Sequence, residues 1–215
     1  TGVSTLAKLL NPKIKVIAVE PAGAACLKAS LEAGEVTTVS KINTIADGTA
    51  VQTPGDKLFP YLQANVDHVI TVDDSELTLS FLDMAENHKM IVENSGLLTV
   101  AALKHLDFKG KKVVSVLSGG NMDVLTMATV VQNGLMQRDR IFTVSVMLPD
   151  KPGQLAAVSS LIAKEQGNVI KLEHNVFANV NRTAGVELTI TLESFGTEHK
   201  DQIIKALEAA GYCPV

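Results

Sequence analysis

The chain has 215 residues, of which 46% are hydrophobic and 20% are charged, and its formal net charge is −4. This composition excludes a disordered protein, and its mildly acidic balance gives no electrostatic basis for binding nucleic acid. No apolar run reaches the roughly 20 residues that span a bilayer, and the sequence opens on no signal-peptide pattern, so we expect neither membrane insertion nor secretion.

The first part of the chain alternates helix-period segments with short buried strands. The expected helices are residues 1–10, 24–33, 58–66, 77–87, 95–106 and 122–133, and the expected strands are residues 14–19, 68–72 and 112–117. Asp73 and Glu76 have the spacing of a capping box before the fourth helix. This alternation predicts a parallel α/β sheet, in which ligands bind beyond the carboxyl ends of the strands.

A polar break at residues 134–140 is expected to link a first domain, residues 1–133, to a second, residues 141–215. The expected elements of the second domain are a strand at 141–148, a helix at 154–166, strands at 169–180 and 186–192, a helix at 197–210, and a last strand that begins at 212. This βαββαβ order is that of the ferredoxin-like fold.

A Ser-Gly-Gly-Asn motif follows the third expected strand of the first domain. Gly119 and Gly120 let the backbone approach a ligand, Ser118 offers a hydroxyl, and the following helix offers free amides. A tight turn with Asn121 as the helix N-cap explains the same residues equally well. Spacing alone therefore leaves both interpretations open.

Two other segments of the first domain hold candidate ligand contacts. Gly48 follows an aspartate inside an apolar stretch, where a plain turn is as good an explanation. Glu93 follows another apolar run, and it either lies near a cofactor or caps the helix that begins at Ser95. Local sequence favours capping.

The sequence gives little support for a metal site. Glu20 and the carbonyl of Ala24 are weak candidates, because no second carboxylate follows until Glu32. The two cysteines, Cys26 and Cys213, have no metal-ligand or CxxC spacing and suit the reducing cytoplasm. Motifs of hydrolases, metalloproteases and nucleotide triphosphatases are absent from the chain.

In the second domain, the connection between the first strand and the first helix contains Asp150, Pro152 and Gly153. Pro152 and Gly153 leave amides exposed at a helix N-terminus, which suits a small carboxylate. A plain βα turn has similar local chemistry, so this motif alone is only suggestive.

Together these motifs resemble those of threonine ammonia-lyases, also called threonine dehydratases. The resemblance covers the C-terminal part of the catalytic domain, through VIAVEP at 16–21, IADG at 45–48, ENSG at 93–96 and LSGGN at 117–121. Residues from about 140 to 215 resemble an ACT regulatory domain. The resemblance implies part of a fold type II sheet with helices on both faces, pyridoxal 5'-phosphate as cofactor, and conversion of L-threonine to 2-oxobutanoate and ammonia in isoleucine biosynthesis.

The resemblance also implies roles for individual residues. Ser118 matches the serine that hydrogen-bonds the pyridine nitrogen of the cofactor, and Gly48 and Glu93 match positions beside the ring. Gly119, Gly120 and Asn121 complete the cofactor-binding turn. A neutral hydroxyl keeps that nitrogen less firmly protonated than a carboxylate would, which favours prompt loss of the β-hydroxyl of the substrate.

For the second domain, the resemblance implies an amino-acid effector. We expect it to bind at Asp150, Pro152, Gly153 and Asn168, across an interface between copies of a homo-oligomer, either a dimer or a tetramer. Binding there would shift activity through different affinities for two states.

This chain also departs from the family pattern. The family's Schiff-base lysine and glycine-rich phosphate loop lie upstream of the position of Thr1, so we assign no catalytic residue and expect these 215 residues, as part of a larger protein, to be inactive alone. Cys26 replaces an aspartate of the cation site of related serine racemases. Two alternatives stay open: a non-catalytic amino-acid-sensing module, and a serine dehydratase or racemase of the same fold.

Overall fold

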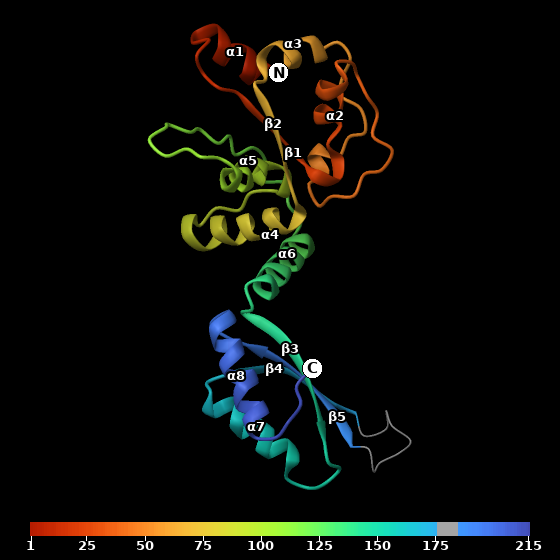
Figure 1. The fold of residues 1–215 in the computed structure, drawn as a ribbon, viewed down its shortest axis with the longest axis vertical. Helices are drawn as coiled ribbons and strands as arrows, with labels where there is room; N and C mark the ends of the chain where they lie inside the picture. The colour runs from red at the N-terminus through yellow and green to blue at the C-terminus, as the bar shows by residue number, and fades with distance from the viewer. Residues whose placement is uncertain (176–184) are drawn as a thin grey trace. The chain divides into compact units, whose positions relative to one another are not determined.

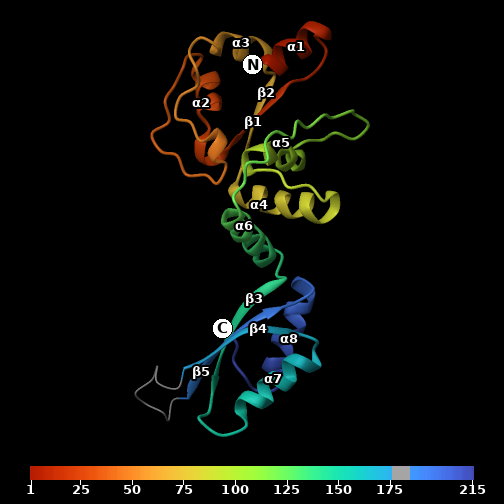
Figure 2. The same cartoon turned by 180° about the vertical axis from the view of Figure 1, so that it is seen from behind.

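The computed structural model describes residues 1–175 and 185–215. Contacts divide the chain into two compact units, Thr1–Val131 and Gln132–Val215 (Figures 1 and 2). None of the helices in the described ranges has the length and apolar character that a membrane span requires.

The described part of the first unit contains two parallel strands, which correspond to two of the three that the sequence predicts. Strand β1 (Ile17–Pro21) pairs with β2 (His68–Val72), and Ile17 lies opposite His68. The helical elements around them are α1 (Gly2–Leu10), η1 (Ala22–Ala24), α2 (Cys26–Ala33), η2 (Asp47–Thr49) and α3 (Phe59–Asn65). Helix α2 ends at Gly34, whose φ of 77° is the left-handed conformation that glycine adopts without strain.

Helix α4 starts where the capping box predicts. The Asp73 amide donates to Glu76 Oε2 at 2.9 Å, and the Asp73 side chain accepts from the amide of Glu76. The elements that follow are α4 (Asp74–Asp83), η3 (Met84–His88), η4 (Asn94–Leu97), α5 (Leu98–Ala101), η5 (Ala102–His105) and α6 (Val124–Gln137). Leu77, Phe81 and Leu97 are fully buried in the core that these helices share.

Two expectations for this part of the chain are wrong. Residues 112–117 form no strand, although they are rich in β-branched residues, because no described strand lies beside them to complete a hydrogen-bond ladder. The polar break expected from residue 134 is helical as far as Gln137, since one glycine inside a helix costs only about 1 kcal/mol. The helix ends at Gln137, and Asp139, two residues later, has a left-handed φ of 52°.

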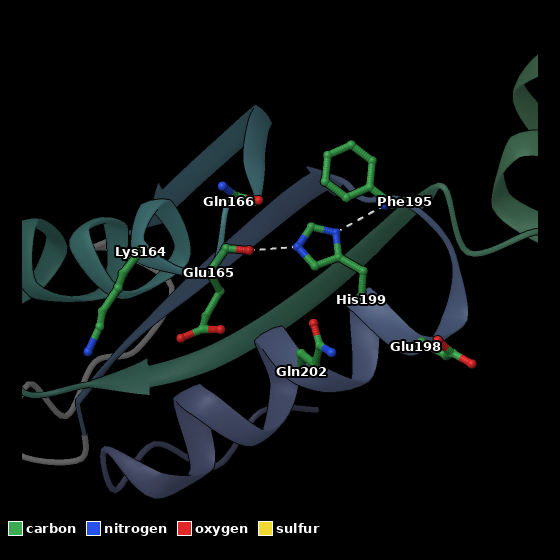
Figure 3. A pocket seen from close by; sticks show the side chains of 7 residues that line it. All are labelled: Lys164, Glu165, Gln166, Phe195, Glu198, His199 and Gln202. Atoms are coloured by element: carbon green, nitrogen blue, oxygen red, sulfur yellow. Dashed lines mark hydrogen bonds between the residues drawn. The ribbon is translucent and has the colours of Figure 1, made fainter.

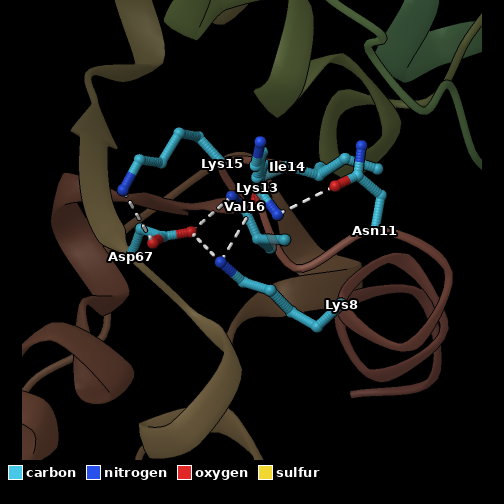
Figure 4. A network of polar contacts seen from close by, with 7 residues as sticks. All are labelled: Lys8, Asn11, Lys13, Ile14, Lys15, Val16 and Asp67. Carbon is cyan, nitrogen blue, oxygen red and sulfur yellow. Dashed lines mark hydrogen bonds and ion pairs between the residues drawn. The ribbon is translucent and has the colours of Figure 1, made fainter.

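Asp67, directly before β2, makes polar contacts with α1 and with the residue directly before β1 (Figure 4). Its Oδ2 accepts from Lys8 Nζ and from the Val16 amide, each at 2.7 Å, and its Oδ1 lies 3.3 Å from Lys15 Nζ. Lys8 Nζ also donates to the Ile14 carbonyl at 2.9 Å. Lys8, and then the Val16 amide, hold the pKa of Asp67 well below its usual range.

Asp67→Asn should therefore destabilise the protein in a pH-dependent way. A depressed native pKa means that the stabilisation is complete above the unfolded pKa of about 4 and is lost as pH falls below it. The difference in urea midpoint between wild type and variant should be largest at pH 7 and should shrink steadily from pH 4 to pH 3. Asp56→Asn, an exposed control, should change little at any pH. A difference for Asp67→Asn that stays constant with pH would contradict the charged contact.

The second unit is a three-stranded antiparallel sheet with two helices on one face (Figures 1 and 2). Its elements are β3 (Ile141–Leu148), α7 (Gln154–Lys164), β4 (Asn168–Asn175), β5 (Val186–Glu193) and α8 (Thr197–Ala209), in the sheet order β3-β5-β4. Alternate residues of β3 and β5 are buried against Val158 and Ile162 of α7 and Ile203 and Leu207 of α8.

The remaining expectations for this unit concern its strands. The expected strand at 169–180 is β4 as far as Asn175, and its last five residues lie outside the described ranges. The expected last strand is reduced to a pair of backbone hydrogen bonds, each 2.9 Å, between Val215 and Ser145. Only one residue of the C-terminal segment therefore reaches the ladder.

Candidate functional site

Three segments of the first unit, residues 46–49, 93–96 and 118–121, meet where glycines leave room for close contact. A Cβ placed on Gly96 would overlap the carbonyl oxygen of Ser118, and one on Gly119 would overlap the Glu93 carboxylate. A Cβ on Gly48 would lie 2.8 Å from Ser95 Oγ. The structure thus brings together the candidate residues that the sequence spreads over more than 70 positions.

Glu93 links its own segment to the Ser-Gly-Gly-Asn turn. Its Oε2 accepts from the Asn121 amide at 3.1 Å, and its backbone amide donates to the Gly119 carbonyl at 3.4 Å. The expectation that Glu93 caps the following helix is wrong, because its side chain makes no cap hydrogen bond there. The carboxylate instead accepts a hydrogen bond from the amide of Asn121, 28 residues later in the sequence.

Ser118 is exposed, and its hydroxyl makes no hydrogen bond within residues 1–175 and 185–215. Gly119, with a φ of 84°, and Gly120 present bare backbone beside it. Asn121 does not cap α6, which corrects the turn interpretation. Asp123 caps it, since its Oδ1 accepts from the amides of Leu125 and Thr126 at 2.9 and 3.1 Å.

The segment that carries Gly48 is held from two sides. Asp74, at the start of α4, accepts from Thr44 Oγ1 at 2.6 Å and from the Ile45 amide at 3.0 Å. Asn94 Nδ2 donates to the Ile45 carbonyl at 3.1 Å. The side-chain carbonyl oxygen of Asn94, Oδ1, and the Ser95 hydroxyl are buried and have no hydrogen-bond partner among the described residues. Unsatisfied buried polar atoms are uncommon and are often found at functional sites.

Glu20 has a structural role. Its two carboxylate oxygens each accept a backbone amide of helix α2, from Leu27 and Lys28, at 2.8 Å, and Cys26 Sγ lies 3.8 Å from Oε1. The carboxylate therefore caps a helix N-terminus, which corrects its interpretation, with Ala24, as a cation ligand. Burial, and then the charge of Glu20, raise the pKa of the Cys26 thiol.

Comparison with known proteins decides the family. The family of pyridoxal-phosphate dependent enzymes matches residues 1–119, and the ACT domain matches residues 142–211. The chain belongs to the pyridoxal-phosphate dependent enzymes. Its second unit is an ACT domain, and its elements follow the expected ferredoxin-like order as far as α8.

Relatives of this chain include two bacterial L-threonine ammonia-lyases. It is 36% identical over 214 residues to the L-threonine ammonia-lyase of Geobacter sulfurreducens and 34% identical over 213 residues to that of Thermotoga maritima. These matches cover 98% and 99% of this chain, and 53% of each relative. The chain thus spans about half the length of these relatives.

Solved structures agree with the fold. Threonine deaminase isoform 2 of Solanum lycopersicum is 30% identical with a TM-score of 0.57, and the match covers 61% of this chain and 40% of that one. Maize serine racemase is 36% identical with a TM-score of 0.55, and the match covers 61% of this chain and 43% of the racemase chain. Both are similar to this chain in fold and in part of its sequence.

The residues present fit pyridoxal phosphate. The exposed Ser118 hydroxyl is free to bond a ring nitrogen, and Gly48, also exposed, leaves its surface open to a flat ring. The Glu93 carboxylate is fixed within 3.8 Å of the position that a Cβ on Gly48 would take. Gly96, the glycine of the ENSG motif at 93–96, packs against the Ser118 carbonyl, although it was not among the predicted site residues.

The expected effector residues do not come together within one chain. Asp150, Pro152 and Gly153 are exposed and follow the end of β3, and Gly153, with a φ of 94°, precedes α7. Asn168 starts β4 and donates to Glu193, which pairs with Ile141 at the opposite end of β3. Eight residues of strand separate the two groups by roughly 24 Å.

The second unit has a cavity of about 360 Å³ elsewhere, between the end of α7 and the start of α8 (Figure 3). It is lined by Lys164, Glu165, Gln166, Phe195, Glu198, His199 and Gln202. His199 Nδ1 accepts from the Phe195 amide at 3.0 Å, so its Nε2 carries the proton and donates to the Glu165 carbonyl at 2.6 Å. None of the residues predicted as site residues lines this cavity.

Proposed function

We propose that this chain forms part of a pyridoxal-phosphate-dependent L-threonine ammonia-lyase, which converts L-threonine to 2-oxobutanoate and ammonia. The observation that carries the proposal is the free Ser118 hydroxyl on a turn held by Glu93, whose carboxylate also lies within 3.8 Å of the Cβ position of Gly48. Similarity to L-threonine ammonia-lyases over almost the whole chain supports threonine as the substrate.

In this proposal the residues of the chain orient the cofactor. The Ser118 hydroxyl donates to the ring nitrogen, Gly48 lets the ring lie close to the backbone, and Gly119 leaves room for the Glu93 carboxylate. Glu93 holds the turn through the Asn121 amide, so that Ser118 is already in position before the ring binds. When bound, pyridoxal phosphate supplies an electron sink for the amino-acid substrate. The neutral hydroxyl of Ser118 leaves that sink weaker than a carboxylate would.

The lysine that binds the cofactor covalently is proposed to lie outside these 215 residues, as is the glycine-rich phosphate loop. The chain alone would then hold one side of the site without its covalent anchor. We therefore expect no turnover from the 215-residue polypeptide on its own.

For the ACT domain we propose an amino-acid effector site shared between copies of the chain. The separation of Gly153 from Asn168 within one chain supports a site that two copies complete. Strand β4 supports it too, because it lies at the edge of the sheet and exposes 37% of Val169, 52% of Ile170 and 37% of Leu172. An exposed apolar edge strand is a surface on which another chain can pair. A cytoplasmic location also suits the two free cysteines.

Assays of the full-length protein test the proposal. It should produce 2-oxobutanoate from L-threonine, and Ser118→Ala should lower cofactor affinity by about 3- to 10-fold, the loss expected for a hydrogen bond between neutral groups. Ser75→Ala, an exposed control on α4, should change neither value. Faster racemisation than deamination of serine would favour the maize serine racemase type of reaction, and absence of any turnover would favour an amino-acid-sensing module.

The effector site of the ACT domain is tested by calorimetry on the full-length protein. Calorimetry with isoleucine, valine, threonine and serine should detect binding of at least one of them, and no binding of any would exclude this regulatory role.

A further inference from the structure

The extended segment that ends in Ser118 lies along one face of the helical segment that starts at Asn94. Glu93, Gly96 and Thr99 follow one another at intervals of three, so they share a face of that segment. Thr99 Oγ1 donates to the Val116 carbonyl at 3.0 Å, Gly96 packs on the Ser118 carbonyl, and Glu93 accepts from Asn121. Later residues of one segment contact earlier residues of the other, as in an antiparallel pair.

Thr99 makes two of these contacts and lies at the end farthest from the turn. Its backbone carbonyl also accepts from Ser115 Oγ at 3.3 Å. No described strand pairs with residues 112–117, so no backbone ladder fixes how far this segment can slide along the helix. Apart from the 3.4 Å backbone bond from the Glu93 amide to the Gly119 carbonyl, side-chain bonds set its register, and the bond to Val116 is two residues before Ser118.

We propose that Thr99 is a positioning residue that sets the place of the Ser118 hydroxyl, and hence, if the proposed function holds, the fit of the cofactor ring. Thr99 touches neither Ser118 nor the ring, and it acts through the Val116 carbonyl. Since Val116 is exposed, water can replace the lost bond, and global stability should change little. The effect of losing the Thr99 hydroxyl is therefore concentrated on the register of residues 115–121.

Thr99→Val in the full-length protein tests this proposal, because it keeps the shape of the side chain and removes the donor. We expect a loss of about 3- to 10-fold in cofactor affinity and a change in the pH dependence of cofactor absorbance. In the cofactor-free protein, exchange of the Asn121 amide should become several-fold faster. Thr99→Ser, which retains the hydroxyl, should restore all three values.

The matched control is Thr129→Val. Thr129 Oγ1 also donates to a carbonyl at 3.0 Å, that of Leu125 within helix α6, and the variant should leave both cofactor affinity and Asn121 exchange unchanged. Wild-type values of affinity and exchange in Thr99→Val would overturn the proposal, as would equal effects of the two variants. Failure of the wild type to bind pyridoxal phosphate would instead count against the proposed function, and Asn121 exchange would still decide the role of Thr99.

Discussion

Gly96→Ala should destabilise the first unit by about 1–3 kcal/mol, the usual range for overpacking, and should abolish tight cofactor binding. The added Cβ would overlap the Ser118 carbonyl and would lie 2.8 Å from Val92 Cγ1, and Gly96 itself is buried. A backbone atom cannot rotate away as the end of a side chain can, so Ser118 must move. Urea unfolding and titration with pyridoxal phosphate measure the two effects.

Gly55→Ala is the control for this substitution. A Cβ on Gly55 meets no atom within 4 Å, so stability and cofactor affinity should stay close to those of the wild type. If Gly96→Ala bound pyridoxal phosphate as tightly as Gly55→Ala, the close packing of Gly96 on Ser118 would have no part in the site.

Gly119→Ala should affect the cofactor more than the fold. Its φ of 84° costs an alanine about 1–2 kcal/mol, and the new Cβ would overlap the Glu93 carboxylate. Because the carboxylate is the end of a flexible side chain, it can swing away, but only by giving up the Asn121 amide. We expect a modest loss of stability together with a loss of at least about 10-fold in cofactor affinity, by the same measurements.

Gly110→Ala separates the two causes. Gly110 has a similar φ of 74° and no atom within 4 Å of its Cβ position, so it imposes the backbone strain without the collision. It should lose stability as Gly119→Ala does and keep its cofactor affinity. Equal losses of affinity in both variants would show that Glu93 does not hold the turn.

Features that depend on neighbouring residues could be predicted from the sequence. Asp73 and Glu76 form the expected capping box because both partners lie within one turn of helix. The elements of the ACT domain follow the expected order as far as α8, because buried and exposed residues alternate along β3 and β5 and each helix buries one apolar face. By contrast, Glu93 and Glu20 have capping chemistry in common, and only the fold decides that the first binds Asn121 and the second binds α2.

The candidate site was predictable in its motifs and not in its contacts. Ser118, Gly48 and Gly96 belong to glycine-containing motifs, but the contacts of Gly96 with Ser118 and of Thr99 with Val116 join residues more than 15 positions apart. For Thr99, the interval of three to Gly96 and Glu93 is the signal in the sequence that could have identified it. A strand at 112–117 was expected because β-branched residues favour extended backbone, but the composition of a segment does not determine whether a neighbour will pair with it.

The antiparallel contact between residues 93–99 and 115–121 has a consequence for how the chain can vary in length. The connection between the two segments, residues 106–114, contains none of the contacts that set the register, and even doubling its length would cost only about 0.6 kcal/mol of closure entropy. A single residue inserted between Glu93 and Thr99 would instead rotate one partner off the shared face by about 100°. Insertions and deletions should therefore be tolerated in the connection and excluded from the six-residue interval that Glu93 and Thr99 bound.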